Sequence, residues 1–494
     1  MKILVIGVDG LDQRLVENMD MPFMQQQLKR HIPIKIEEDL WSRGWAATLC
    51  GKHGHHTGAF YGKPELNGTH NTTNRFNFNE IGTDTNILPL WKLIADSNLR
   101  VGFMNIPGMN PAPIVNGFAV SGGGAGSNTS ALSGKEGVPD GSCYPKKIKS
   151  ILEKNSYILD TRYSASGIKN KDTLFAVLEK MEINRTLSFV ELSNEFEIDF
   201  GYIAYMATTR IQYLAMSEIE DYIGNAKQPR NELQRKIVRL YRSLDDNIRN
   251  LVDSLNPDHV LYVSDHGASP RLHNINLNSW LAENGYLTEG KKSISVAKSF
   301  LASLRPYIPK GVKKAVRRNI PTLTSSIYKP SINWSRTSAF GARYIPGIYI
   351  NDSKRFEGPI DVKDVELYAQ KIIQDFNNDM KSIKHNLKAR LYRANYKNEP
   401  KEAFLPDIWI DHPDSMFFED NGGFIDPNSN YGTIEKLDNI SQDQHTGVKG
   451  RYPLLIVDKE LYNFISDDDV FDLTLVYKII ARKIKNENWS INTP

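Results

Sequence analysis

The segment from residue 41 to residue 58, WSRGWAATLCGKHGHHTG, combines a hydroxyl, a guanidinium and three imidazoles around one short helical pattern. Ser42 and Arg43 stand just before its apolar run. A serine at the N-terminus of a helix can attack phosphorus, because the unpaired N–H groups and the helix dipole favour a bound phosphate. The same serine can instead simply cap the helix. The sequence leaves both interpretations of Ser42 open.

A second group of candidate residues follows two apolar runs. Asp9 comes directly after ILVIGV, and Asp265 and His266 come after HVLYVS. A carboxylate that follows a buried strand is costly unless it faces a cleft, pairs with a cation or binds a metal. A carboxylate oxygen and an imidazole nitrogen are suitable ligands for zinc or manganese. Asp9 alone could also cap the next helix, but two such strand ends favour a metal site.

The elements that must position these residues recur along the chain. Short β-branched runs, each followed by a polar loop and a helical pattern, occupy 3–9, 101–107, 200–209 and 259–267. Residues 231–255 are typical of a long amphipathic helix. This alternation predicts a mostly parallel central sheet with helices on both faces. Ligands of such sheets lie at the carboxyl ends of the strands, so Asp9, Thr209 and Asp265 are expected to converge there.

The composition is that of an ordinary globular protein. The 494 residues are 40% hydrophobic and 24% charged, and the net charge of +3 gives no argument for nucleic acid as a partner of the whole chain. Cys50 and Cys143 form neither a disulfide framework nor a CxxC zinc motif. The apolar run at the N-terminus is too short for a signal peptide or a membrane span. It is therefore interpreted as a buried first strand, and a cytoplasmic protein is predicted.

One segment departs from this even charge distribution. Residues 291–329 hold ten Lys or Arg and no Asp or Glu. This segment could be a surface for an anionic partner, such as a phosphorylated polymer, nucleic acid or membrane. It could equally be a solvated insertion whose charge balances the acidic remainder of the chain. The scattered aromatic residues lack the stacking pattern of single-strand binders, which favours the solvated insertion.

Ten motifs along the chain, taken in order, resemble those of a known family. They are VIGVDGLD, MPFM, GWAATLCGKHGHHTGAF, FMNIPGMNPAPIVNGFAVSGG, TTRIQY, VSDHG, LNSWLAENGYL, INWSRTSAFG, LPDIWI and QHTG. In this order they resemble the alkaline phosphatase superfamily, in particular its type I phosphodiesterase/nucleotide pyrophosphatase branch. The resemblance implies one alkaline-phosphatase-like α/β domain over residues 1–494, with a mostly parallel sheet and helices on both faces. The basic insertion at 290–330 would interrupt this domain.

The resemblance also implies a metal site with an altered half. In the family two metal ions flank a Thr or Ser nucleophile at a helix N-terminus. The ligands of one ion correspond to Asp9, the Ser42 region, Asp265 and His266. For the other ion the family uses an Asp, a His and a second His, and these positions correspond to Thr209, Tyr213 and His445. Since a hydroxyl and a phenol are poor substitutes for carboxylate and imidazole, one ion is expected and two are possible.

The nucleophile position is altered as well. The family places its Thr or Ser four residues before the aromatic residue of the helix, and here that position holds Trp41, so Ser42 is one residue late. Arg43 or Arg210 could contact the phosphoryl oxygens where the second ion is missing. The sulfatase signature is absent, because Arg43 follows Ser42 at once. The turn with the three histidines matches a family turn that points away from the metals, which favours a solvated loop.

The sequence therefore predicts a metal-dependent phosphoesterase or phosphotransferase with a Ser42 nucleophile. Its substrate would be of the phosphodiester or nucleotide pyrophosphate type, and its ion zinc or manganese. The alternative is a catalytically inactive member of the fold that serves as a binding or scaffold protein. The histidines of the turn, which are His53, His55 and His56, could supply a general acid or replacement ligands for a second ion.

Overall fold

The computed structural model describes residues 1–81, 87–95, 97–123, 134–161, 163, 168–290, 332–437, 439–440 and 444–487. The basic segment at 291–329 lies outside the described residues. The insertion at 290–330 and its anionic partner therefore stay predictions.

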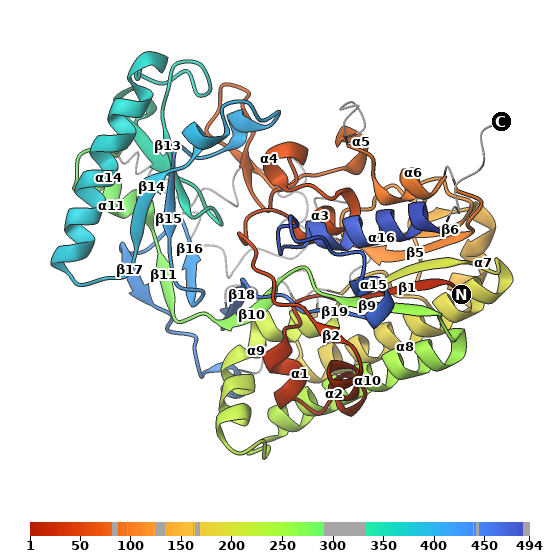
Figure 1. Cartoon of the computed structure of the whole chain (residues 1–494). Helices are drawn as coiled ribbons and strands as arrows, with labels where there is room; N and C mark the ends of the chain where they lie inside the picture. Colours follow the sequence, from red (N-terminus) through yellow and green to blue (C-terminus); the bar gives the residue numbers. More distant parts are fainter. Residues whose placement is uncertain are drawn as a thin grey trace, which may run out of the picture.

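A central sheet of eight strands carries the fold (Figure 1). Its order is β2-β19-β9-β1-β8-β5-β6-β7. The strands are β2 (Ile32–Pro33), β19 (Leu455–Val457), β9 (His259–Val263), β1 (Ile3–Val8), β8 (Phe200–Tyr205), β5 (Val101–Ile106), β6 (Gly117–Ser121) and β7 (Cys143–Tyr144). The strands from β9 to β6 pair in parallel, and the pairs that add β19, β2 and β7 are antiparallel. The four strands predicted from the sequence are thus β1, β5, β8 and β9, all in the parallel part.

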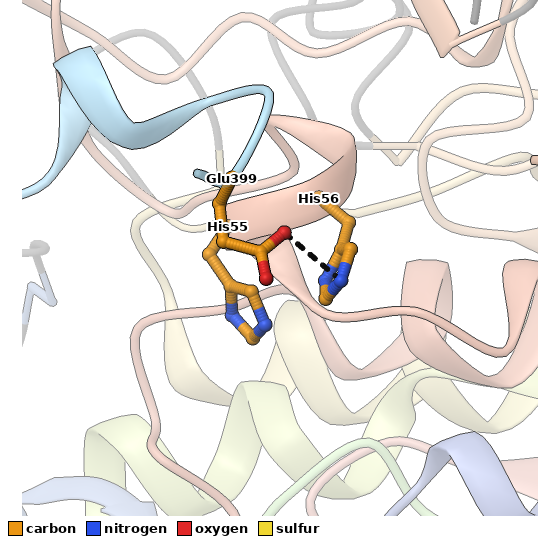
Figure 2. Close-up of side chains that lie close together, drawn as sticks. All are labelled: His55, His56 and Glu399. Atoms are coloured by element: carbon orange, nitrogen blue, oxygen red, sulfur yellow. Dashed lines mark ion pairs between the residues drawn. The ribbon is translucent and has the colours of Figure 1, made fainter. Parts of the chain in front are cut away.

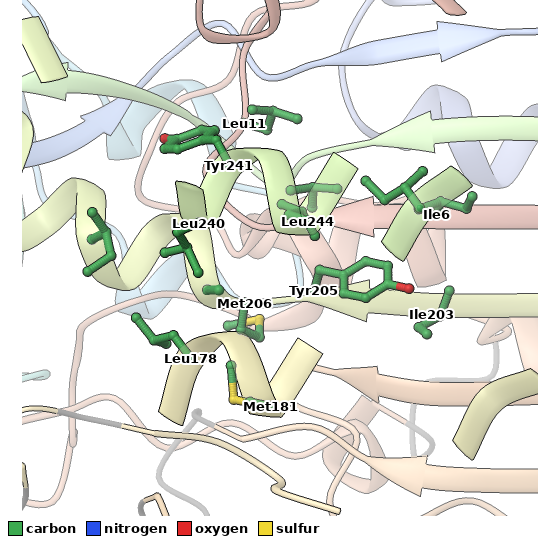
Figure 3. Close-up of a cluster of buried hydrophobic side chains, with 14 of the residues drawn as sticks. Ile6, Leu11, Leu178, Met181, Ile203, Tyr205, Met206, Leu240, Tyr241 and Leu244 are labelled. Carbon is green, nitrogen blue, oxygen red and sulfur yellow. The ribbon is translucent and has the colours of Figure 1, made fainter. Parts of the chain in front are cut away.

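Helices cover both faces of this sheet, as predicted. Alternate side chains of β1 point to opposite faces of the sheet. Leu4, Ile6 and Val8 belong to the hydrophobic cluster on one face, and Ile3 and Val5 to the cluster on the other. In Figure 1 the helices below the sheet include α8 (Lys171–Glu195), α9 (Ala207–Gly224) and α10 (Glu232–Leu255), and those above it include α3 (Gly44–Cys50), α6 (Leu90–Ala95) and α16 (Thr474–Asn486). Figure 3 shows part of the cluster between the lower helices and the sheet.

The long helix α10 shows why the sequence forms these elements. Its apolar residues recur every three or four positions and are buried, with Leu240, Leu244 and Ile248 among them. The side chain of Asn231 caps the helix by accepting a hydrogen bond from the N–H of Gln234. The predicted range of 231–255 differs from the observed helix by one residue at the start.

A second group of sheets lies beside the central sheet, on the left of Figure 1. One is an antiparallel sheet of β12 (Ala339–Gly341), β13 (Gly347–Ile350), β15 (Ile408–Asp411) and β14 (Lys388–Leu391). Another joins β16 (Met416–Phe418), β11 (His273–Ile275) and β17 (Ile425–Pro427). They pack with α11 (Leu277–Glu283) and α14 (Val365–Ser382) around a third hydrophobic cluster. Trp41 and Phe60, from the chain around α3, belong to this cluster.

The remaining elements are short. They include α1 (Gln13–Asn18), α2 (Pro22–Arg30), α4 (Gly54–Thr57), α5 (Phe78–Ile81), α7 (Lys149–Lys154), α15 (Lys459–Tyr462) and the strand pairs β3 (Lys63–Pro64) with β4 (Thr72–Thr73) and β10 (Gly267–Pro270) with β18 (Gly447–Gly450). Within the described ranges, no helix has both the length and the apolar character that crossing a bilayer requires.

Candidate active site

Three side chains that could hold a metal ion meet at the carboxyl ends of two neighbouring strands. Asp9 follows β1, and Asp265 and His266 follow β9, which pairs with β1 in parallel. One donor atom from each side chain lies within 4.8 Å of the other two. The Nε2 atom of His266 is 3.6 Å from Oδ1 of Asp9 and 3.7 Å from Oδ2 of Asp265. The structure thus brings together the three residues that the sequence singled out at strand ends.

Hydrogen bonds hold these side chains in a ligand-like arrangement. The indole N–H of Trp45 donates to Oδ2 of Asp9 (2.9 Å), and the hydroxyl of Tyr61 donates to Oδ2 of Asp265 (2.9 Å). Nδ1 of His266 lies 2.6 Å from the carbonyl oxygen of Gly267, to which it can only donate. The lone pair of Nε2 therefore faces the carboxylates, as in a metal-binding histidine. Among the described residues, Oδ1 of Asp265 is buried without a hydrogen-bond partner.

Burial disfavours the charged forms of all three groups. It raises the pKa of Asp9, and it raises that of Asp265 to about 8 together with the neighbouring charge of Asp9. Burial and the charge of Lys449 hold the pKa of His266 well below its usual range. Two buried carboxyl groups and a neutral imidazole form a donor set whose negative charge a divalent cation would compensate. The residues present therefore fit one zinc or manganese ion.

A lysine supplies a positive charge at the same place. Lys449 lies on β18 opposite Ala268 of β10, the strand that follows His266. Its Nζ atom is buried, has no hydrogen-bond partner among the described residues and lies 2.7 Å from the centroid of the Tyr61 ring. Burial lowers the pKa of Lys449 to about 7, although Asp265 and Asp9 act to raise it. The charges of Arg43 and Asp39, on either side of Ser42 in the sequence, also act on this pKa.

The residues expected at the second metal position form an aromatic stack. The ring of Tyr213 is stacked on His445, with centroids 5.5 Å apart, and its hydroxyl lies 3.3 Å from Nε2 of His266. The hydroxyl of Tyr163 lies 3.0 Å from Nε2 of His445. Burial and three arginines lower the pKa of His445 to about 3. Thr209 is buried and lies in the first turn of α9. Because this set offers one imidazole and otherwise only a phenol and a hydroxyl, it does not fit a second divalent ion.

The hydroxyl of Ser42 is paired with a carboxylate. It donates to Oδ2 of Asp39 (2.8 Å) and accepts from the N–H of Gly54 (3.1 Å). Ser42 does not cap α3, because that helix starts at Gly44 and Arg43 is its N-cap residue. The backbone of Gly44 packs so closely on Asp265 that a Cβ there would lie 2.2 Å from the Asp265 carbonyl oxygen. The first residue of α3 thus packs directly against Asp265.

The two arginines proposed from the sequence are already engaged. Arg43 donates to the carbonyl oxygens of Phe60 (2.9 Å) and Asn74 (2.6 Å). One terminal nitrogen of Arg210 donates to both carboxylate oxygens of Asp160, at 2.9 and 3.0 Å. Both arginines still act on the site through their charge, since burial raises the pKa of Asp9 and of Tyr61 and the charges of Arg210 and Arg43, respectively, oppose this rise.

The three histidines of the turn belong to two other groups. His53 lies between Asp472 (3.0 Å) and Glu38 (3.8 Å). His55 and His56 are on α4 and meet Glu399 (Figure 2), with Nε2 of His56 3.0 Å from the carboxylate. None of the three joins the group formed by Asp9, Asp265 and His266. The solvated loop favoured by the sequence is a one-turn helix with half-buried imidazoles.

The His53 group leads to a prediction about stability. Although burial alone would lower it, Asp472 and Glu38 raise the pKa of His53 to about 9. A histidine whose pKa is higher in the folded state than in the unfolded state stabilises the folded state. This contribution is complete below the pKa of the unfolded state, about 6.5, and is lost as the pH rises through 9. We therefore expect the unfolding temperature to fall between pH 7 and pH 10. In differential scanning fluorimetry, the unfolding temperature of His53→Gln should fall less steeply over this pH range. His385→Gln serves as the control. Parallel curves for all three chains would contradict this role.

Four contributors to the site were missed from the sequence, namely Asp39, Trp45, Tyr61 and Lys449. Lys449 had a usable signal, since it stands two residues after the motif QHTG that was singled out. Trp45 was quoted only as part of a motif, without a role at the site. Nothing in the local pattern distinguishes Tyr61 or Asp39 from other polar residues of a loop.

Comparisons with known proteins bear on the family and the fold of this chain. A family model described as type I phosphodiesterase / nucleotide pyrophosphatase matches residues 48–421. Phosphonoacetate hydrolase from Sinorhizobium meliloti 1021 is similar over 97% of this chain and 95% of that chain, with 10% identity and a TM-score of 0.54. Murine ectonucleotide pyrophosphatase / phosphodiesterase 5 is similar over 98% and 95%, with 11% identity and a TM-score of 0.45. No curated protein matches the sequence. The likeness to phosphonoacetate hydrolase shows that this chain shares the fold of that protein.

Proposed function

The chain belongs to the type I phosphodiesterase / nucleotide pyrophosphatase family, and we propose that it hydrolyses phosphodiesters or nucleotide pyrophosphates with one divalent metal ion. One observation carries this proposal. One carboxylate oxygen of Asp265 and the ammonium of Lys449 are buried without a hydrogen-bond partner among the described residues, and both side chains contact Tyr61. A metal ion with a phosphoryl group would provide the partner that each of them lacks.

Asp9, Asp265 and His266 would hold the ion, which is zinc or manganese by the chemistry of its ligands. When bound, the ion supplies Lewis-acid stabilisation of a phosphoryl oxygen. Trp45 and Tyr61 orient the two carboxylates through the hydrogen bonds described above. His445 was proposed as a ligand from the sequence, and in this structure it is bound to Tyr163 instead. We therefore expect one ion at this site.

Lys449 would bind an equatorial phosphoryl oxygen, which is the role that the sequence suggested for Arg43 or Arg210. Its ammonium can donate three hydrogen bonds and has no acceptor among the described residues. A fixed positive charge beside the transferring group stabilises the charge of the transition state in a buried site. Two carboxylates, one divalent ion and one ammonium leave a net positive charge for the anionic substrate.

Ser42 would be the nucleophile, with Asp39 as its general base. The hydroxyl already donates to Asp39 at 2.8 Å, which is the distance expected for a nucleophile and its base. As Oγ of Ser42 bonds to phosphorus, its proton passes to Asp39 and the leaving oxygen departs. Water then attacks phosphorus in this serine phosphodiester, the phosphomonoester product leaves, and Oγ of Ser42 takes the proton back from Asp39. The hydrogen bond from Gly54 to the same oxygen fixes its orientation.

Hydrolysis of bis(p-nitrophenyl) phosphate tests this function. After chelation and desalting, we expect added zinc or manganese to raise the rate by about 100-fold or more, because a metal ion contributes several kcal/mol to phosphoryl transfer. Thr209→Ala should keep this activity, since Thr209 belongs to the position that does not fit an ion. Failure to hydrolyse phosphodiester, pyrophosphate and monoester substrates with either metal would favour the inactive binding or scaffold protein. The cytoplasmic location stays a prediction.

A further inference from the structure

His55, His56 and Glu399 form a separate cluster on the surface side of α4 (Figure 2). One donor atom from each side chain lies within 4.8 Å of the other two. The two imidazole centroids are 4.2 Å apart, and Nε2 of His56 is 3.0 Å from Oε2 of Glu399. Figure 2 shows both rings pointing to the same side as the carboxylate. All three residues are half-buried, so an ion could reach them from solvent.

The backbone holds this cluster in place on both sides. His55 and His56 lie on α4, whose N-terminal residue Gly54 donates to Ser42 and which ends at Gly58 in the left-handed region. Glu399 lies in the turns between η7 (Arg393–Tyr396) and η8 (Glu402–Phe404). Its N–H donates to the carbonyl oxygen of Tyr396 at 2.9 Å.

A direct link joins these two segments of the chain. The N–H of Lys401 donates to the carbonyl oxygen of His55 at 3.2 Å, and the ring of Tyr396 lies 5.0 Å from that of His55. The three donors are therefore close before any ion binds, which lowers the entropy cost of closing a metal site.

We propose that His55, His56 and Glu399 form a second metal site, for a transition-metal ion of the zinc or cobalt(II) class. Two imidazoles and one carboxylate are a donor set that these ions prefer, whereas calcium and magnesium require oxygen ligands. Water would complete the coordination. The site shares no ligand with Asp9, Asp265 and His266, and it does not depend on the function proposed above.

Without a metal, the same residues form an ion pair between His56 and Glu399 beside two imidazole rings that are tilted by 49° to each other.

Such an ion would join two parts of the fold. The segment with α4 continues from α3, which packs on the central sheet, whereas Glu399 follows β14 of the antiparallel sheet. Binding only to the folded state stabilises a protein in proportion to the logarithm of ligand concentration. The ion would thus act as a structural link beside the Ser42 loop.

Metal content of the full chain without an affinity tag tests this proposal. In an Asp265→Asn background, which removes a ligand of the first site, we expect one bound Zn²⁺ per chain by elemental mass spectrometry after desalting. Co²⁺ in its place should give the visible absorption of a low-coordinate complex. Adding His55→Ala or Glu399→Gln should remove both signals, whereas His385→Ala should keep them.

Two results would overturn the proposal. One is an Asp265→Asn chain that retains no Zn²⁺, and the other is unchanged metal content after both His55→Ala and Glu399→Gln. Circular dichroism of each variant shows whether it is folded, and the milder His55→Gln replaces His55→Ala if that chain unfolds. In the native chain, Zn²⁺ should raise the unfolding temperature more than in Glu399→Gln. Phosphodiester hydrolysis by Glu399→Gln should stay near that of the native chain, which separates this site from the proposed active site.

Discussion

Asp265→Asn is expected to abolish metal-dependent hydrolysis of bis(p-nitrophenyl) phosphate and to remove the ion from the active site. The substitution keeps the shape of the side chain and its contact with Tyr61 but removes the charge that attracts the cation. Even mutation of a residue that only hydrogen-bonds to a metal ligand lowers metal affinity or activity by about 10–100-fold. Loss of a ligand itself should therefore lower kcat/KM by more than about 100-fold.

The measurement combines kcat/KM with metal content for each chain. Asp245→Asn is a matched control, because Asp245 is also a buried carboxyl group with a raised pKa. Its carboxylate accepts hydrogen bonds from the N–H groups of Phe23 and Met24, both at 2.8 Å, on the opposite side of the sheet from α3. We expect Asp245→Asn to lower the unfolding temperature but to keep the active-site ion. Full activity in Asp265→Asn would exclude the proposed metal site.

Much of the fold could be predicted from local patterns. The strands β1, β5, β8 and β9 are continuous apolar runs bounded by polar loops, and such runs are typical of strands buried on both faces. Because β1 and β9 are parallel neighbours, the residues after them had to meet at the same edge of the sheet. This is why Asp9, Asp265 and His266 could be grouped from the sequence, although they are more than 250 positions apart.

The rest of the site depends on tertiary pairing that no local pattern shows. Lys449 lies over the ring of Tyr61, where the charges of Asp265 and Asp9 act on it, only because β18 pairs with β10 in a register that places Gly450 opposite Gly267. A register shifted by one residue would turn the Lys449 side chain to the other face. Tyr61 likewise depends on the isolated bridge between Ser42 and Phe60. These placements need the whole fold, since the strands concerned are short and unremarkable in composition.

Trp41 shows what a local comparison of motifs can misjudge. It stands where the family pattern places a nucleophile, yet it is fully buried, stacked on Phe60 at 3.9 Å, and its indole N–H donates to the carbonyl oxygen of Gly62. Its role is packing between the α3 segment and the antiparallel sheet. We propose that the neighbouring hydroxyl of Ser42, which faces Asp39, takes the place of this nucleophile.

Lys449→Met is the second substitution with a large expected effect. Methionine has nearly the same shape as the lysine stem, so the change removes chiefly the buried charge. Loss of one preorganised electrostatic donor at a transition state typically costs about 10²–10³-fold in kcat. We expect a loss of this size in kcat, with the active-site ion still bound, because Lys449 is not one of its ligands.

The combination of lost kcat and retained metal separates catalysis from structure. Lys449→Arg keeps the charge and should recover part of the rate. Lys63→Met is a matched control, because Lys63 is also a buried lysine, but its Nζ donates to the carbonyl oxygen of Gly58 away from the three ligands. If Lys449→Met kept native kcat, its ammonium would not contact the phosphoryl group. If it lost the ion together with the activity, Lys449 would be needed to build the metal site, because a group that only stabilises the transition state does not alter metal content.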